Sequence, residues 1–74
     1  MKKEKGKLYI NPSKDLVIMC TKKSYKGNAN FEGVILYNGN LSVEIGTYSD
    51  TWMINNFTEL VGPIHLNNVT INNN

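Results

Sequence analysis

Three residues have side chains of the types that form a nucleophilic catalytic triad: Ser49, Asp50 and His65. A hydrolase of this kind also needs a sharp turn that exposes the nucleophile and a cluster of donors around the oxyanion, and the sequence contains neither motif. Ser49 and Asp50 instead suit the cap of a short helical turn, because their side chains accept hydrogen bonds from nearby backbone N–H groups. The sequence therefore predicts a protein that is not an enzyme.

Metal and cofactor chemistry has equally little support in the sequence. One cysteine, Cys20, and one histidine cannot supply the four ligands of a structural zinc site. The six glycines are dispersed and form no phosphate-binding loop. We expect no metal and no cofactor, and we expect Cys20 to be a small buried apolar side chain at the end of a strand.

The single cysteine also excludes an intramolecular disulfide, which is typical of a reducing compartment. The longest apolar run, residues 16–20, is far shorter than the ~20 residues of a membrane span, and no N-terminal run resembles a signal peptide. We therefore expect a cytoplasmic protein without membrane contact.

Lysines and aromatic residues are the candidates for binding. All eight lysines lie in residues 1–26 with two acids, a net charge of +6, whereas the remainder has four acids, no base and a charge of −4. Such segregation indicates either a solvated basic segment or a surface for nucleic acid or an acidic partner. The absence of arginine favours the first reading, because arginine makes the bidentate contacts to bases and phosphates. The candidate partner-binding residues are Lys22, Lys23, Tyr25, Lys26, Tyr48 and Trp52.

Short strands must position these residues, since 74 residues suffice for one small domain. Leu8–Ile10 and Leu16–Thr21 are expected strands, separated by a turn at Asn11–Asp15 with a proline and backbone-bonding side chains. The polar residues Lys22–Asn30 are expected to form a loop with an interleaved aromatic. The loop is either simply solvated, which is the favoured reading, or a site for phosphates with one stacked base or for a protein partner.

An Asn-Gly pair at residues 38–39 lies between two alternating apolar runs, which favours a hairpin with a type I′ turn. With a two-residue loop, Val34 and Leu36 would share a dry face with residues of a strand at 40–46, and a bulge near Gly33 would return Phe31 to the core. A three-residue loop stays open as the alternative register. Its apolar face would hold Phe31, Gly33, Ile35 and Tyr37.

The remaining chain predicts one helical turn within Thr51–Asn56, a last strand at Phe57–Val61 and an additional edge strand at Ile64–Ile71. Together the elements predict an all-β domain, a small five-stranded SH3-like barrel with one helical turn before its last strand. We expect a flexible lysine-rich lead-in at residues 1–7, the barrel at 8–62 and an edge strand or tail at 63–74. Phe31 and Phe57 are expected in the core, and Trp52 either in the core or at a partner.

Three short motifs carry a resemblance: Gly33 two residues after Phe31, then the run Val43–Trp52 (VEIGTYSDTW), then Phe57-Thr-Glu59. They resemble small uncharacterised SH3-like proteins of bacteriophages and mobile elements over about residues 8–60. The match departs from the pattern where Thr58 separates Phe57 from Glu59. The resemblance implies a fold, a phage or mobile-element source and a bacterial host cytoplasm, and it implies no activity for any residue.

These features lead us to expect a non-enzymatic module that binds a protein partner through residues 22–30 and 48–52, for example an inhibitor of a host defence or regulatory protein. Nucleic-acid binding by the lysine-rich N-terminal third is the first alternative. The second is a small structural or homo-oligomeric phage component that pairs through the edge strand at 64–71.

Overall fold

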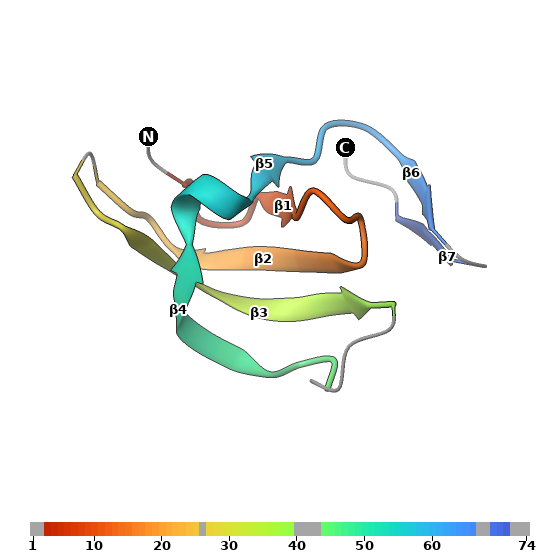
Figure 1. The fold of residues 1–74 in the computed structure, drawn as a ribbon, viewed down its shortest axis with the longest axis horizontal. Coiled ribbons are helices and arrows are strands. Elements are labelled where there is room, and N and C mark those ends of the chain that lie inside the picture. The colour runs from red at the N-terminus through yellow and green to blue at the C-terminus, as the bar shows by residue number, and fades with distance from the viewer. Residues whose placement is uncertain (1–2, 26, 40–43, 67–68, 72–74) are drawn as a thin grey trace.

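The structure, a computed structural model, describes residues 3–25, 27–39, 44–66 and 69–71. Five antiparallel strands of the described chain form one sheet in the order β4-β3-β2-β1-β5, and two further strands pair separately (Figure 1). The elements are β1 (Leu8–Ile10), β2 (Leu16–Lys22), β3 (Asn30–Asn38), β4 (Tyr48–Met53), the 3₁₀ turn η1 (Ile54–Asn56), β5 (Thr58–Glu59), β6 (Ile64–Leu66) and β7 (Val69–Ile71). The predicted all-β class is confirmed. The sheet is not closed, because β4 and β5 are its two outer strands.

The turn between β1 and β2 is held by one asparagine. Asn11 Oδ1 accepts hydrogen bonds from the backbone N–H groups of Asp15 and Leu16, both at 3.1 Å, and Asn11 Nδ2 donates to Asp15 Oδ1 at 2.6 Å. Lys14 takes a left-handed conformation with φ of 58°. The predicted turn at residues 11–15 is confirmed, and it aligns β1 and β2 so that Tyr9 lies opposite Ile18.

Strand β3 buries its odd-numbered residues, and a register shift against β2 places Tyr37 in a different buried cluster from Phe31 and Ile35. Phe31 and Ile35 are buried, with Ile35 wholly inaccessible, whereas the Leu36 side chain is 39% exposed. The predicted dry face through Val34 and Leu36 is therefore wrong, and β3 instead buries the residues that the alternative register assigned to its apolar face, with Tyr37 in a separate cluster. Gly33 explains part of this choice, since a Cβ atom there would lie 2.7 Å from the carbonyl oxygen of Met19 on β2.

The predicted two-residue hairpin at residues 38–39 is also wrong. Val34 pairs with Tyr48, and the Ile35 N–H donates to the Thr47 carbonyl at 3.0 Å, so β3 pairs with residues beyond the expected partner strand. The Gly39 N–H donates to the Asp15 carbonyl at 2.7 Å and thus contacts the β1–β2 turn. A turn that ends at Gly46, with φ of 92°, leads into β4. The rest of the expected strand, residues 40–43, lies outside the described residues.

The irregularity expected near Gly33 is present. The β3–β4 register shifts between Phe31 and Gly33, and the β2–β3 register shifts between Cys20 and Lys22. Phe31 nevertheless shares the buried face with Ile35 by simple alternation along β3.

The predicted helical turn before β5 is confirmed as the 3₁₀ turn η1, at the end of the expected range. Thr51 and Met53 belong to β4, and η1 comprises only residues 54–56, with Ile54 buried. Ser49 and Asp50 are strand residues and cap nothing in η1, whose N-cap position is Met53 without a side-chain bond. The capping prediction is therefore wrong, because the β-forming sequence around Trp52 extends the strand.

The last part of the chain forms a small hairpin in place of the predicted single edge strand. Ile64 pairs with Ile71 and Leu66 with Val69, so β6 and β7 pair with each other. Within the described residues, no helix is long and apolar enough to cross a membrane.

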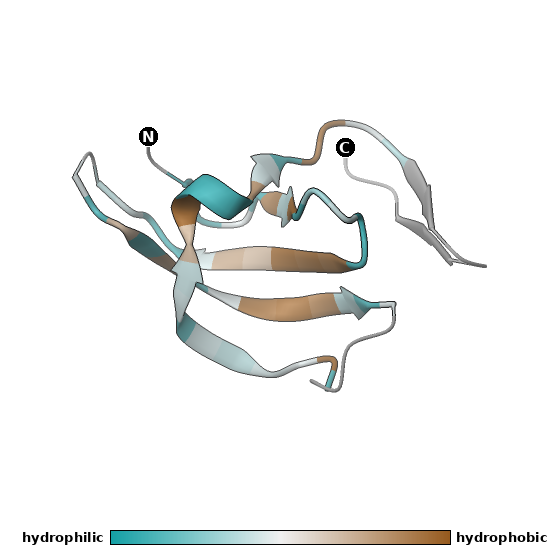
Figure 2. Ribbon diagram, viewed as in Figure 1, coloured by the Kyte–Doolittle hydropathy of each residue, from teal (hydrophilic) through white to brown (hydrophobic). Residues whose placement is uncertain are grey.

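An aromatic cluster joins the two ends of the sheet across the core. The Phe31 ring lies 5.6 Å from the Tyr9 ring and 5.4 Å from the Phe57 ring, and Trp52 packs on Phe57 at 6.3 Å. Edge and tilted contacts of this kind stabilise beyond the area that they bury. Figure 2 shows the most apolar sequence along β2 and β3, the centre of the sheet. A second buried cluster, which includes Leu8 and Ile10, uses the alternate residues of β1.

Residues 3–7, expected as part of a flexible lead-in, contact the sheet. The Gly6 N–H donates to the Cys20 carbonyl at 2.8 Å, and the Cys20 N–H donates to the Lys7 carbonyl at 3.0 Å. Lys3 is 3% exposed. This segment therefore belongs to the folded unit.

Candidate functional site

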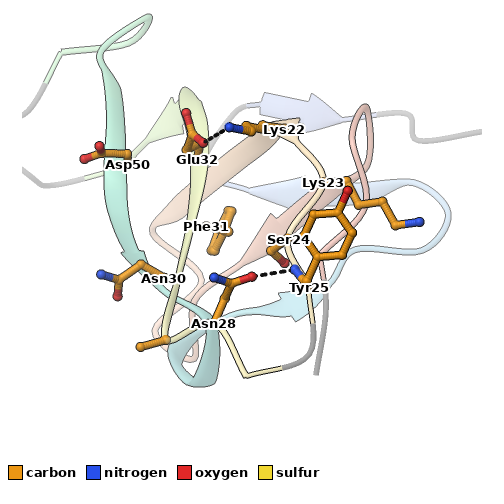
Figure 3. Close-up of a pocket in the computed structure, with 10 residues that line it drawn as sticks. Lys22, Lys23, Ser24, Tyr25, Asn28, Asn30, Phe31, Glu32 and Asp50 are labelled. Atoms are coloured by element: carbon orange, nitrogen blue, oxygen red, sulfur yellow. Dashed lines mark hydrogen bonds and ion pairs between the residues drawn. The ribbon is translucent and has the colours of Figure 1, made fainter.

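A concavity of about 410 Å³ lies between the loop that follows β2 and the facing parts of β3 and β4. We call it the loop concavity. Its lining comes from residues 22–25 and 28–32 and from Asp50 of β4 (Figure 3). Lys22, Lys23 and Tyr25, three of the predicted site residues, therefore lie together, and the fold adds a residue from the predicted 48–52 segment.

The loop is shaped by a tight turn around Tyr25. The Tyr25 N–H donates to Asn28 Oδ1 at 2.6 Å, and the Asn28 N–H donates to the Tyr25 carbonyl at 3.0 Å. Residue Tyr25 is 65% exposed, and the Lys23 ammonium lies 5.9 Å from the centroid of its ring. A large aromatic side chain is thus presented to solvent by a backbone that its neighbours hold in place.

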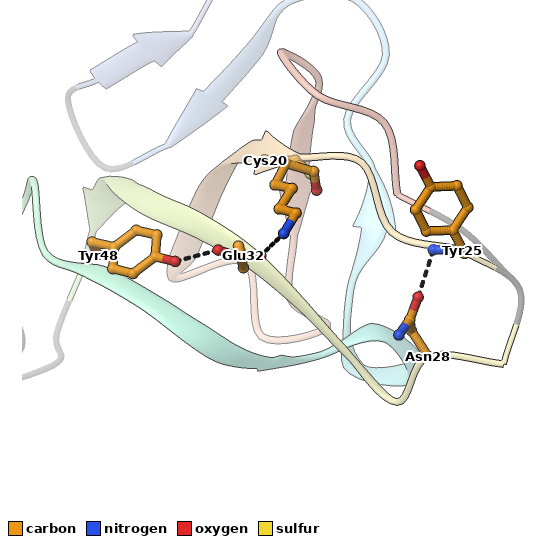
Figure 4. Close-up of polar contacts among 6 residues, drawn as sticks. Cys20, Tyr25, Asn28, Glu32 and Tyr48 are labelled. Atoms are coloured by element: carbon orange, nitrogen blue, oxygen red, sulfur yellow. Dashed lines mark hydrogen bonds and ion pairs between the residues drawn. The ribbon is translucent and has the colours of Figure 1, made fainter.

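One carboxylate connects three adjacent strands at the concavity. The Lys22 Nζ of β2 lies 3.7 Å from Glu32 Oε2 of β3, and the Tyr48 hydroxyl of β4 donates to Glu32 Oε1 (Figure 4). This hydrogen bond to a carboxylate raises the pKa of Tyr48 to about 12, because ionisation would remove the donor and place two negative charges together. Tyr48 therefore contacts the concavity through Glu32 and does not line it.

Trp52 occupies a different place from the other predicted site residues. It lines a second concavity of about 380 Å³ with Pro12, Asn56 and Phe57. Its Nε1 donates to the Gly33 carbonyl at 3.0 Å, and its ring packs on Phe57. Half-buried Trp52 thus supports the core on one side and faces the second concavity on the other. Lys26 lies outside the described residues.

Sequence reasoning missed two acidic members of the loop concavity. Glu32 and Asp50 are far apart in sequence, and only the β3–β4 pairing brings both to the loop. Glu32 could have been recognised from the sequence, because it is a charged residue between two buried neighbours on an apolar strand. Asp50 could not, because it was assigned to a cap.

The lysine-rich N-terminal third does not present all its charges to solvent. Lys3 is buried, and its Nζ donates to the Phe57 carbonyl at 2.8 Å and lies 4.6 Å from the Tyr9 ring centroid. Burial lowers the pKa of Lys3. Lys7 pairs with Glu59 at 3.3 Å, and Lys22 pairs with Glu32. Part of the basic charge is therefore neutralised or enclosed by the fold.

The Cys20 thiol is enclosed by the fold as well. Cys20 is buried, its thiol donates to the Lys22 carbonyl at 3.2 Å, and burial raises its pKa. Among residues 3–25, 27–39, 44–66 and 69–71, no group of three or more histidine, cysteine or acidic side chains could hold a metal ion.

The fold and site together define a small all-β protein with a polar concavity of mixed charge at one end of its sheet. Comparison with protein families, with curated proteins and with solved structures finds no match for the chain.

Proposed function

We propose that this protein is a non-enzymatic interaction module that binds a protein partner at the loop concavity. The observation that carries the proposal is the exposed Tyr25 ring on a hydrogen-bonded loop beside Lys23. Tyrosine at the centre of an interface supplies apolar contact area and a hydrogen-bonding hydroxyl, which is why it is common among residues that dominate binding. A loop that is already ordered loses little conformational freedom on association.

The charges of the concavity favour a protein over a nucleic acid. Lys22 and Lys23 line it together with Glu32 and Asp50. A phosphate backbone gains affinity from clustered cations and would be repelled by two carboxylates. A protein surface carries both signs of charge and can match both. Lys7 is paired with Glu59 and Lys3 is buried, so these two lysines contribute less to a nucleic-acid-binding surface, the alternative function.

The motif resemblance suggests a more specific proposal. The chain would come from a phage or mobile element, and its partner would be a host defence or regulatory protein. The mixed charge of the loop concavity supports a protein partner whether or not the chain comes from a phage or mobile element.

Site-specific photocrosslinking tests the proposal. One variant carries a benzoylphenylalanine in place of Tyr25, and a control carries it in place of Val61, which is 79% exposed and lies away from the concavity. We expect position 25 to capture a discrete protein from bacterial lysate and position 61 to capture none. With that partner purified, Tyr25→Ala should weaken binding by about tenfold or more, and Val61→Ala by less than about twofold.

Three results would contradict the proposal: equal capture at both positions, capture of nucleic acid alone, or unchanged affinity in a Tyr25→Ala variant whose circular dichroism matches the parent.

A further inference from the structure

The middle of the binding loop is bonded to a residue near the start of the chain. The Lys3 N–H donates to Ser24 Oγ at 2.6 Å, and the Ser24 N–H donates back to the Lys3 carbonyl at 2.9 Å. Ser24 lines the loop concavity between Lys23 and Tyr25 and is itself buried. The backbone that displays the exposed tyrosine is thus tied to residue 3.

Lys3 is in turn bonded to residues outside the loop. Its ammonium donates to the Phe57 carbonyl, next to η1, and lies against the Tyr9 ring. The Glu4 N–H donates to the Tyr9 hydroxyl at 2.7 Å. Through one residue, the loop is connected to β1 and to the start of β5.

We propose that residues 3–7 form a strap that holds the loop concavity in its binding shape, with Lys3 as the positioning residue that anchors the strap. The inference rests on the proposed function for the role of the loop, whereas the link between the strap and the loop order is independent of any partner. Burial of a charged side chain is costly, and here the cost is offset by a charge-assisted hydrogen bond and a cation–π contact. An exposed lysine without partners would not order the loop. Lys3 orders it because the residue is buried and is bonded through both its backbone and its side chain.

Amide hydrogen exchange tests the strap without a partner. Lys3→Met keeps an apolar chain of similar length and removes the ammonium. We expect the protection of the Ser24, Tyr25 and Asn28 amides to fall about tenfold or more, while the amides of Ile18 and Ile35 in the central strands change by less than about twofold. Lys5→Met is the matched control, because it makes the same change two residues away on an exposed side chain, and it should leave the loop amides unchanged.

Ser24→Ala keeps the test decisive if Lys3→Met fails to fold, since it deletes a single oxygen. It should lower protection in the loop and leave the central strands unchanged. The double variant should lose no more loop protection than Lys3→Met alone, because the Phe57–Lys3 bond and the Lys3–Ser24 bond lie in series in one connection, and breaking either releases the loop.

The strap is overturned if Lys3→Met and Lys5→Met behave alike, if the central strands lose as much protection as the loop, or if the two single effects add in full. Once a partner is purified, Lys3→Met should weaken its binding by the factor seen in the exchange of the loop. Confirmed loop release with unchanged binding would remove the loop as the binding site and leave the strap standing.

Discussion

Glu32 of β3 contacts both neighbouring strands of the sheet. It is bonded to Lys22 on one neighbouring strand and to Tyr48 on the other. The Lys22 contact is a long, solvent-exposed ion pair, a type that stabilises proteins by only about 0–1 kcal/mol. The Tyr48 contact is the one with a chemical consequence, because it raises the pKa of an exposed phenol.

The titration of Tyr48 provides a prediction at the residue scale. In the native protein, NMR of the tyrosine ring carbons should show Tyr48 ionising near pH 12. Glu32→Gln keeps an oxygen acceptor and removes the negative charge, so the Tyr48 pKa should fall toward the ordinary value of about 10. A pKa that stays near 12 in the variant would show that Glu32 is not the cause.

The same group contributes to stability in a defined pH range. Because the folded pKa of Tyr48 is higher than the unfolded value, the folded state retains the phenol proton over this range. The contribution of the hydrogen bond is therefore fully present below pH about 10 and is lost as the pH rises through about 12.

For β3, the sequence predicted the strand correctly but assigned the wrong residues to its buried side. Its alternation is clear, and both faces carry apolar residues, so local chemistry alone allowed two registers. The deciding contacts are non-local: Gly33 fits against the backbone of Met19, and the Gly39 N–H bonds to Asp15.

A matched pair of substitutions checks the face of β3 at the scale of the element. Ile35→Ala removes a fully buried side chain and should lower the free energy of unfolding by about 2–5 kcal/mol. Leu36→Ala, on the exposed face, should lower it by about 1 kcal/mol or less. Denaturant unfolding followed by the fluorescence of Trp52 measures both. The opposite order would restore the face predicted from the Asn-Gly turn.

The elements that the sequence predicted correctly are those set by neighbours in the chain. The bounds of β1 and the turn after it follow from residues 8–15 alone, since Asn11 satisfies the local backbone. The partner strand of β3 was predicted at 40–46, whereas Val34 pairs with Tyr48 of β4, because the register of β3 depends on tertiary contacts. The site divides in the same way: Lys23 and Tyr25 could be named from one loop, whereas Glu32 and Asp50 required the pairing of β3 with β4.

At the scale of the whole molecule, the beginning of the described chain and the last strand of the main sheet hold one another. Lys3 bonds to Phe57, Lys7 pairs with Glu59, and the Leu60 N–H donates to the Leu8 carbonyl at 2.8 Å. These contacts connect segments separated by about fifty residues. Long-range pairing of this kind slows folding and makes the loss of structure cooperative.

The reaction rate of the buried Cys20 thiol can be used to measure this cooperativity. Its position between β1 and β3, with a bond to the Lys22 carbonyl and a raised pKa, should slow its reaction with a disulfide reagent by on the order of a thousandfold or more relative to the unfolded chain. If the sheet opens as one unit, the free energy obtained from thiol exchange and the free energy obtained from Trp52 fluorescence should agree and share one denaturant dependence. A thiol reaction rate that does not change with denaturant concentration would instead indicate a local opening of β2.

One thiol and one indole therefore make this chain its own reporter. The reactivity of Cys20 reports the opening of the sheet and the fluorescence of Trp52 reports its unfolding, so two independent signals follow one protein without an engineered residue.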